Sequence, residues 1–99
     1  MAGNKLDGII EAVRYESDGA IRIVSAYERH GAVWSDHILL GRKDLAERLK
    51  RGQRFAAGRR KEYLGNVFET GAAIRLEQGR IVTAGQAAEH DLLSGVPVF

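Results

Sequence analysis

The chain has 99 residues, of which 44% are hydrophobic and 28% charged, and its formal net charge is +2. This length fits one domain with one core, and the composition excludes a wholly disordered chain. The chain contains no cysteine, which excludes disulfides and thiolate metal sites. It begins without the apolar stretch of a signal peptide and has no apolar run long enough to cross a bilayer, so we expect a cytoplasmic protein with no membrane association.

Apolar alternation and turn residues predict three strands at the start of the chain. We expect them over Leu6–Tyr15, Ala20–Glu28 and Ala32–Leu40. Asp18-Gly19 between the first two predicts a hairpin turn, because glycine accepts positive φ at no steric cost. In the third strand neither face is purely apolar, so its register stays open.

Alternation along the second strand assigns its side chains to two faces. One face carries Ile21, Ile23, Ser25 and Tyr27, and the other carries Arg22, Val24, Ala26 and Glu28. Because large aromatic side chains favour burial, we expect Tyr27 in the core beside the two isoleucines.

A single internal helix is predicted over Arg42–Arg51. Leu45 and Leu49 lie four residues apart and give it a narrow apolar face toward the rest of the domain. Asp44 precedes Arg48 by four residues, a spacing at which we expect an ion pair along the helix surface.

The second half of the chain predicts further strands over Gln53–Tyr63, Val67–Leu76 and Arg80–Thr83. A short helix over Gln86–Leu93 and an apolar tail follow. We therefore expect a mainly β fold, a small five- to six-stranded barrel over residues 1–85 with one short helix between strands 3 and 4, and a C-terminal helix and tail over 86–99. The helix position is that of an OB-like barrel, and an SH3-like barrel is the alternative.

The end of the internal helix resembles a known family. The run Leu45–Arg59 has an Ala-Glu early in the helix, a basic residue and Gly52 at its end, and Gly58 in the following strand. It is similar to the passage from the helix to the fourth strand in bacterial single-stranded-DNA-binding proteins. This resemblance covers residues 41–60, and it implies an OB fold that binds single-stranded DNA.

Positive charge is concentrated between Arg42 and Tyr63. This segment holds nine Lys or Arg and three Asp or Glu, a net charge of +6, whereas the rest of the chain carries −4. A basic patch attracts polyanions, and each phosphate contact releases counterions. The alternative is a solvated helix face without a ligand.

Rings beside such a patch are candidates for stacking bases. Trp34 shares a strand face with Asp36, and Tyr63 lies next to a run of three cations, so these two rings are favoured over Phe55 and Phe68, which we expect in the core. The predicted nucleic-acid-binding residues are Arg22, Trp34, Arg48, Lys50, Arg51, Arg54, Arg59, Arg60, Lys61 and Tyr63.

Catalytic and metal-binding motifs are not evident. Asp36 and His37 are neighbours on a predicted strand and point to opposite faces, so they do not readily chelate one ion. The serines lack the G-x-S-x-G pattern, and the glycines form no phosphate-binding loop. We expect a non-catalytic protein without a metal or cofactor.

These features predict a module that binds nucleic acid, mainly single-stranded DNA or RNA, with little sequence specificity, because phosphate contacts position a strand without reading it. The alternative is a protein–protein interaction or homo-oligomeric assembly module. The apolar tail Val96-Pro97-Val98-Phe99 is the candidate contact for a protein partner, and packing on its own barrel or a frayed end are its other readings.

Overall fold

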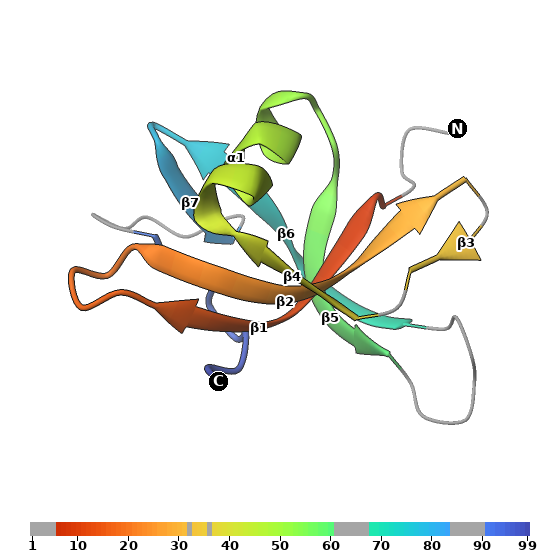
Figure 1. The fold of residues 1–99 in the computed structure, drawn as a ribbon, viewed down its shortest axis with the longest axis horizontal. Helices are drawn as coiled ribbons and strands as arrows, with labels where there is room; N and C mark the ends of the chain where they lie inside the picture. The colour runs from red at the N-terminus through yellow and green to blue at the C-terminus, as the bar shows by residue number, and fades with distance from the viewer. Residues whose placement is uncertain (1–5, 32, 36, 61–67, 84–90) are drawn as a thin grey trace.

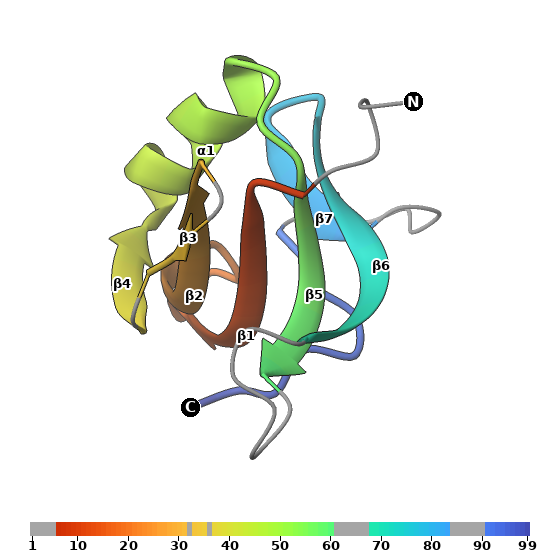
Figure 2. The ribbon, with the colours of Figure 1, turned by 90° about the vertical axis from the view of Figure 1, so that its right-hand side faces the viewer.

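The computed structural model describes residues 6–31, 33–35, 37–60, 68–83 and 91–99. Its elements are β1 (Gly8–Tyr15), β2 (Ile21–His30), β3 (Val33–Trp34), β4 (Ile38–Gly41), α1 (Arg42–Lys50), β5 (Phe55–Arg60), β6 (Phe68–Glu77) and β7 (Arg80–Thr83). The strands form one sheet in the order β3-β2-β1-β5-β6-β7, and β4 also pairs with β2. The sheet curls into a half-barrel with α1 against it (Figures 1 and 2). The prediction of a small, mainly β barrel with one short helix is confirmed.

The predicted third strand is two short strands that share one edge of β2. β3 pairs with the end of β2, and β4 pairs with its middle. Between them, the Ser35 N–H donates to the Glu28 carbonyl at 2.7 Å, and the Ser35 Oγ accepts from the Glu28 N–H at 2.9 Å. The Ser35 side chain thus satisfies the β2 backbone where the partner strand breaks, which is why the sequence shows no clean alternation there.

The central strand is β1, and its two edges have three partners. One edge pairs antiparallel with β2, and the other pairs parallel with β5 from Gly8 and Phe55 to Ile10 and Ala57. Parallel strands need a crossover connection, which α1 provides (Figure 1). Further along β1, the Val13 N–H donates to the Pro97 carbonyl at 2.8 Å, so the C-terminal segment packs on its own barrel.

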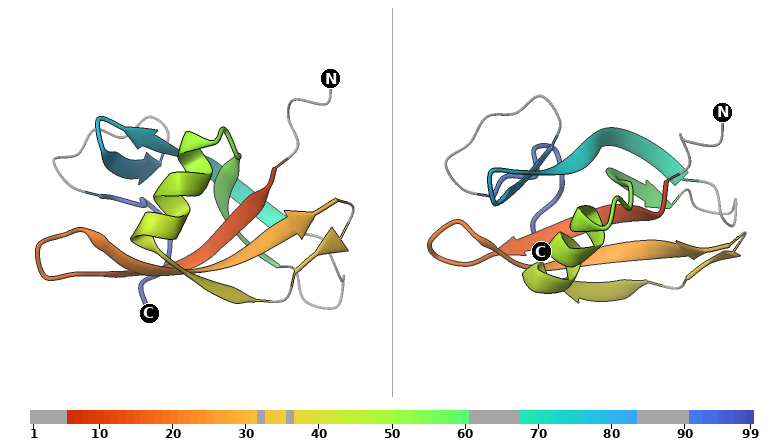
Figure 3. Two further views of the ribbon diagram at one scale, coloured as in Figure 1. Left: turned by 45° about the horizontal axis from the view of Figure 1, so that its top comes forward. Right: turned by 90° about the horizontal axis from the view of Figure 1, so that it is seen from above.

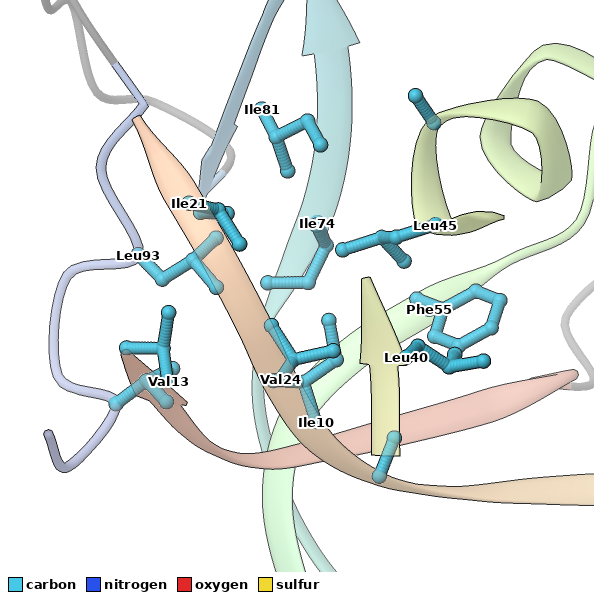
Figure 4. Close-up of a cluster of buried hydrophobic side chains, with 13 residues drawn as sticks. Ile10, Val13, Ile21, Val24, Leu40, Leu45, Phe55, Ile74, Ile81 and Leu93 are labelled. Atoms are coloured by element: carbon cyan, nitrogen blue, oxygen red, sulfur yellow. The ribbon is translucent and has the colours of Figure 1, made fainter. Parts of the chain in front are cut away.

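Apolar side chains from the strands, α1 and the C-terminal segment converge on one core (Figure 4). Leu45 is fully buried and Leu49 packs at the core margin, as the helix pattern predicts. Phe55 is buried in the core, which confirms that prediction. Leu93 and Val96 are buried as well, so the segment beyond β7 contributes to the same core as the strands.

The prediction of a helix over Gln86–Leu93 is wrong for residues 91–93. Residues 86–90 lie outside the described residues, and residues 91–93 are not helical. Leu92 instead forms a parallel bridge with Val82 on the outer edge of β7. Backbone pairing along a strand edge outweighs the weak local helix preference of this stretch. No helix in the described part of the chain is long and apolar enough to cross a membrane.

A buried carboxylate fixes this C-terminal segment. Asp91 is 3% exposed, and its Oδ2 accepts from the Ile21 N–H at 2.8 Å while its Oδ1 accepts from the Ile81 N–H at 2.9 Å. Arg42, the first residue of α1, donates to the same carboxylate from Nε at 2.6 Å and from Nη2 at 3.1 Å. Burial raises the pKa of Asp91, but the hydrogen bonds from Arg42 and the two amides outweigh it and hold the pKa below its usual value. One side chain therefore joins β2, β7 and α1.

Replacing Asp91 by Asn should lower the free energy of unfolding by about 1–3 kcal/mol, because the buried carboxylate that accepts from the Ile21 and Ile81 amides and from Arg42 is lost. Urea denaturation near neutral pH measures this loss. The control is Asp18→Asn, since Asp18 is exposed and accepts only from the Ala20 N–H at 3.0 Å, and we expect its effect to stay under about 1 kcal/mol.

The Asp91 contribution also predicts an acid dependence. Because its pKa is lower in the folded chain than the unfolded value of about 3.9, its stabilisation is present above that value and is lost as the pH falls toward the folded pKa. The stability of the Asp91→Asn variant should fall less steeply over this acid window. Equal slopes for the variant and the unchanged chain would contradict the role assigned to Asp91.

Two glycines of the β5–β6 pair should respond differently to a methyl group. A Cβ at Gly58 would lie 2.3 Å from the Glu69 carbonyl oxygen, whereas at Gly71 the nearest atom would be the Ala57 carbonyl oxygen at 3.7 Å. We expect Gly58→Ala to destabilise the fold by more than about 1 kcal/mol and Gly71→Ala to be neutral or to stabilise it by up to about 1 kcal/mol. Thermal denaturation of both variants tests this, and equal losses would contradict it.

Candidate nucleic-acid interface

Four side chains from four strands meet at one end of the sheet, and we call them the aromatic–arginine cluster: Tyr27, Trp34, Arg60 and Phe68. The ring centroids of Trp34 and Phe68 lie 4.7 Å apart, and those of Tyr27 and Phe68 lie 5.2 Å apart. The Arg60 guanidinium carbon lies 4.5 Å from the Tyr27 centroid and 5.4 Å from that of Phe68. Its Nη2 donates to the Ser35 carbonyl at 3.3 Å. The cluster thus combines rings in tilted contact with a cation.

A β-bulge places this cluster on the face of β2 opposite the core. Opposite β1, the pairing passes from Arg14–Ile23 to Tyr15–Ile21, so Arg22 is an extra residue. The side-chain alternation of β2 shifts there. Tyr27 is buried, as predicted, but Ile21 belongs to the main core cluster and Tyr27 does not. The prediction that Tyr27 shares the face of Ile21 is therefore wrong, because it assumed an unbroken strand.

Exposed cations lie at the end of α1 and just before β5. We call these the helix-end cations: Lys50, Arg51 and Arg54. The Arg54 carbonyl accepts from the Asp7 N–H at 2.7 Å, and Asp7 Oδ1 lies 3.7 Å from Arg29 Nη2. Arg29 is the register partner of Trp34. This chain of contacts connects Arg54 to the aromatic–arginine cluster, and β3 with the end of β2 extends beyond α1 (Figure 3).

Two predicted phosphate ligands already have carboxylate partners. Arg48 Nε donates to Glu28 on β2 at 2.5 Å, and Arg48 reaches only the backbone carbonyl of Asp44, at 3.2 Å. The prediction of a side-chain pair along the helix is therefore wrong, because a partly buried acid on β2 competes for the same guanidinium. Arg59 Nε donates to Glu69 at 2.7 Å across the β5–β6 pair, at the surface. Both pairs reduce the positive charge that these arginines offer to a ligand.

The structure does not bring all predicted residues together. Arg22 is exposed near the start of β2, seven residues before Arg29, a separation of about 23 Å along an extended strand. Lys61 and Tyr63 lie outside the described residues. Phe68 is the residue that the sequence analysis assigned to the core. Its pairing opposite Arg60 in the β5–β6 register is what turns it toward the cluster, and only a correct register could have shown this.

A polar group beside the cluster has residue types that suggest catalysis. His37 Nε2 lies 3.1 Å from Glu11 Oε1 and also contacts the Ser25 Oγ. A catalytic triad needs the serine and the acid on different ring nitrogens, and here both approach Nε2. The Tyr27 hydroxyl donates to Glu11 at 3.5 Å, and burial, followed by the Glu11 charge, raises the pKa of Tyr27. This group supports the Tyr27 ring and lacks the connectivity of a triad.

Metal binding has no support in the described ranges, where no three His, Cys, Asp or Glu side chains gather. No family model, curated protein or solved structure matches the chain. The candidate site is therefore defined by its geometry, which gathers aromatic rings in the cluster and places exposed cations at the end of α1.

Replacing Arg60 by Lys should destabilise the fold by about 0.5–2 kcal/mol, because an ammonium cannot lie flat against the Tyr27 and Phe68 rings as a guanidinium does. The matched control is the neighbouring Arg59→Lys, which keeps a charge near Glu69 at the surface and should change stability by less than about 0.5 kcal/mol. Urea denaturation compares the two variants. Equal losses would show that Arg60 does not hold the cluster together.

Proposed function

We propose that this domain binds single-stranded nucleic acid at the end of the sheet that carries the aromatic–arginine cluster. Trp34 and Phe68 stack on bases, and the helix-end cations contact phosphates. The observation that carries the proposal is the chain of contacts that joins Arg54 to Trp34 through Asp7 and Arg29. Stacking rings beside a positive surface are the combination that single-strand binders use.

Single strands suit this surface better than duplexes. A base presents its π-face to a protein ring only when it is unstacked from its neighbours, and Trp34 and Phe68 are both partly exposed. The resemblance of Leu45–Arg59 to bacterial single-stranded-DNA-binding proteins supports the same ligand class. Every base has a π-face, and phosphate contacts do not read sequence, so binding shows little sequence preference.

A protein-interaction module is the second candidate, and a different observation favours it. Val33 on β3 and Leu39 on β4 are 64% and 60% exposed, and both lie at one edge of the sheet. Exposed apolar side chains on an edge strand are suited to pairing with another chain. A salt-independent oligomer in solution that ignores nucleic acid would favour this reading over the first.

Fluorescence anisotropy of a labelled single-stranded oligonucleotide across a salt series tests the proposal. We expect affinity that falls with salt and exceeds the affinity for a duplex of the same sequence. Trp34→Ala should weaken binding by about 1–3 kcal/mol, the loss of one stacked base. Binding that is absent at low salt, or equal for duplex and single strand, would refute the proposal.

Charge removal locates the phosphate contacts. We expect the replacement of Lys50, Arg51 and Arg54 by Ala to reduce the steepness of the salt dependence. The slope of log affinity against log salt concentration should become shallower by about 2, since each lost contact to a single strand contributes about 0.7. Arg22→Ala is the control, because Arg22 is an equally exposed arginine near the other end of β2. A larger effect from Arg22 than from the helix-end cations would place the strand on a different surface.

A further inference from the structure

A fourth ring extends the row of rings in the aromatic–arginine cluster. The centroid of the His37 ring, just before β4, lies 5.2 Å from that of Tyr27. Tyr27 in turn contacts Phe68, and Phe68 contacts Trp34. The four rings therefore form one continuous row, with His37 at one end and Trp34 at the other.

Two polar side chains hold His37 in this row. Its Nε2 contacts the Ser25 Oγ on β2 and lies 3.1 Å from Glu11 Oε1 on β1. Ser25 is buried, whereas 51% of the His37 side chain is exposed. The ring is thus anchored through one nitrogen, and about half of the side chain stays accessible to a ligand.

The Glu11 carboxylate determines which nitrogen of His37 carries the proton. A neutral imidazole has one N–H donor and one nitrogen that accepts. A carboxylate oxygen beside Nε2 accepts a hydrogen bond and repels a lone pair, so it keeps the proton on Nε2. Nδ1 is then the acceptor, and none of the residues that the structure describes donates to it. The row of rings therefore ends in an available hydrogen-bond acceptor.

We propose that His37 Nδ1 accepts a hydrogen bond from the exocyclic amino group of one base in the bound strand, an inference that rests on the proposed function. Only the Tyr27 ring separates His37 from Phe68. A strand that stacks bases on Trp34 and Phe68 therefore brings a neighbouring base to His37.

The chemistry of the bases makes this contact selective at one position. Adenine, cytosine and guanine carry an exocyclic amino group, and uracil and thymine do not. The ring N–H of uracil lies between two carbonyl oxygens, which repel a further acceptor. His37 thus adds a modest preference for bases with an amino group to a surface that otherwise binds without selecting sequence.

Two oligonucleotides that differ in this group test the preference. The probes are labelled single strands of about eight deoxycytidines or eight deoxyuridines, within the site size of one small barrel. We expect the unmodified protein, near pH 8, to bind the deoxycytidine strand about three- to tenfold more tightly, the effect of one hydrogen bond. Trp34→Ala should weaken both complexes and leave their ratio unchanged, because stacking does not distinguish the two bases.

A pair of histidine variants assigns the preference to a residue. His37→Phe keeps a ring at the end of the row and removes both nitrogens, so the ratio of the two affinities should fall below about twofold. His30→Phe is the matched control. His30 is exposed at the end of β2 and, within the described residues, makes no ring contact with the cluster, so its replacement should preserve the ratio.

Imidazole ¹⁵N resonances of the unmodified protein give a second measurement that needs no variant. The His37 Nδ1 resonance should move toward that of a hydrogen-bonded nitrogen when the deoxycytidine strand binds, and it should stay in place with the deoxyuridine strand. This titration decides the question if His37→Phe does not fold.

The outcomes separate this inference from the proposed function. Equal affinity of the unmodified protein for the two strands, or a preference that survives in His37→Phe, would overturn the role of His37 and leave the proposed function standing. Failure of the unmodified protein to bind any oligonucleotide would overturn the proposed function and this inference with it.

Discussion

The fold depends on the way β1 is paired on both edges. β2 occupies one edge, while β5 and then the C-terminal segment divide the other, so the chain on either side of α1 is held to one central strand. Asp91 reinforces this arrangement, because it accepts hydrogen bonds that join the start of β2 and β7 to α1.

The bulge at Arg22 determines which side chains of β2 lie on each face of the sheet. It lets Ile21 and Val24 both enter the core, and it directs Tyr27 to the opposite face, where Arg60 covers its ring. A sheet with one buried face would leave its other face polar. Here the twisted end of the sheet also carries rings on that second face, and the Arg60 guanidinium covers two of them.

Local patterns in the sequence predicted the elements better than their pairing. The apolar spacing of Leu45 and Leu49 placed α1, and the predicted Arg80–Thr83 strand matches β7. The split of the third strand was not predictable from alternation, because the Ser35 side chain replaces a backbone partner. The position of Phe68 and the partner of Arg48 depend on register and on residues far away in the chain, which no local window contains. Of the predicted site residues, the structure brings Trp34 and Arg60 into one cluster, and the sequence could not reveal that Arg48 and Arg59 are paired with acids.

Trp34 is the only tryptophan in the chain, so the tryptophan fluorescence of the protein reports directly on the proposed surface. The decisive measurement is a titration of the unlabelled protein with an unlabelled single strand at low salt, with the matching duplex as the control. The account predicts that the single strand quenches Trp34 emission as a base stacks on the indole, and that added salt restores it. Emission that is unchanged by the single strand, or quenched equally by the duplex, would contradict the assignment of this surface to single-stranded nucleic acid.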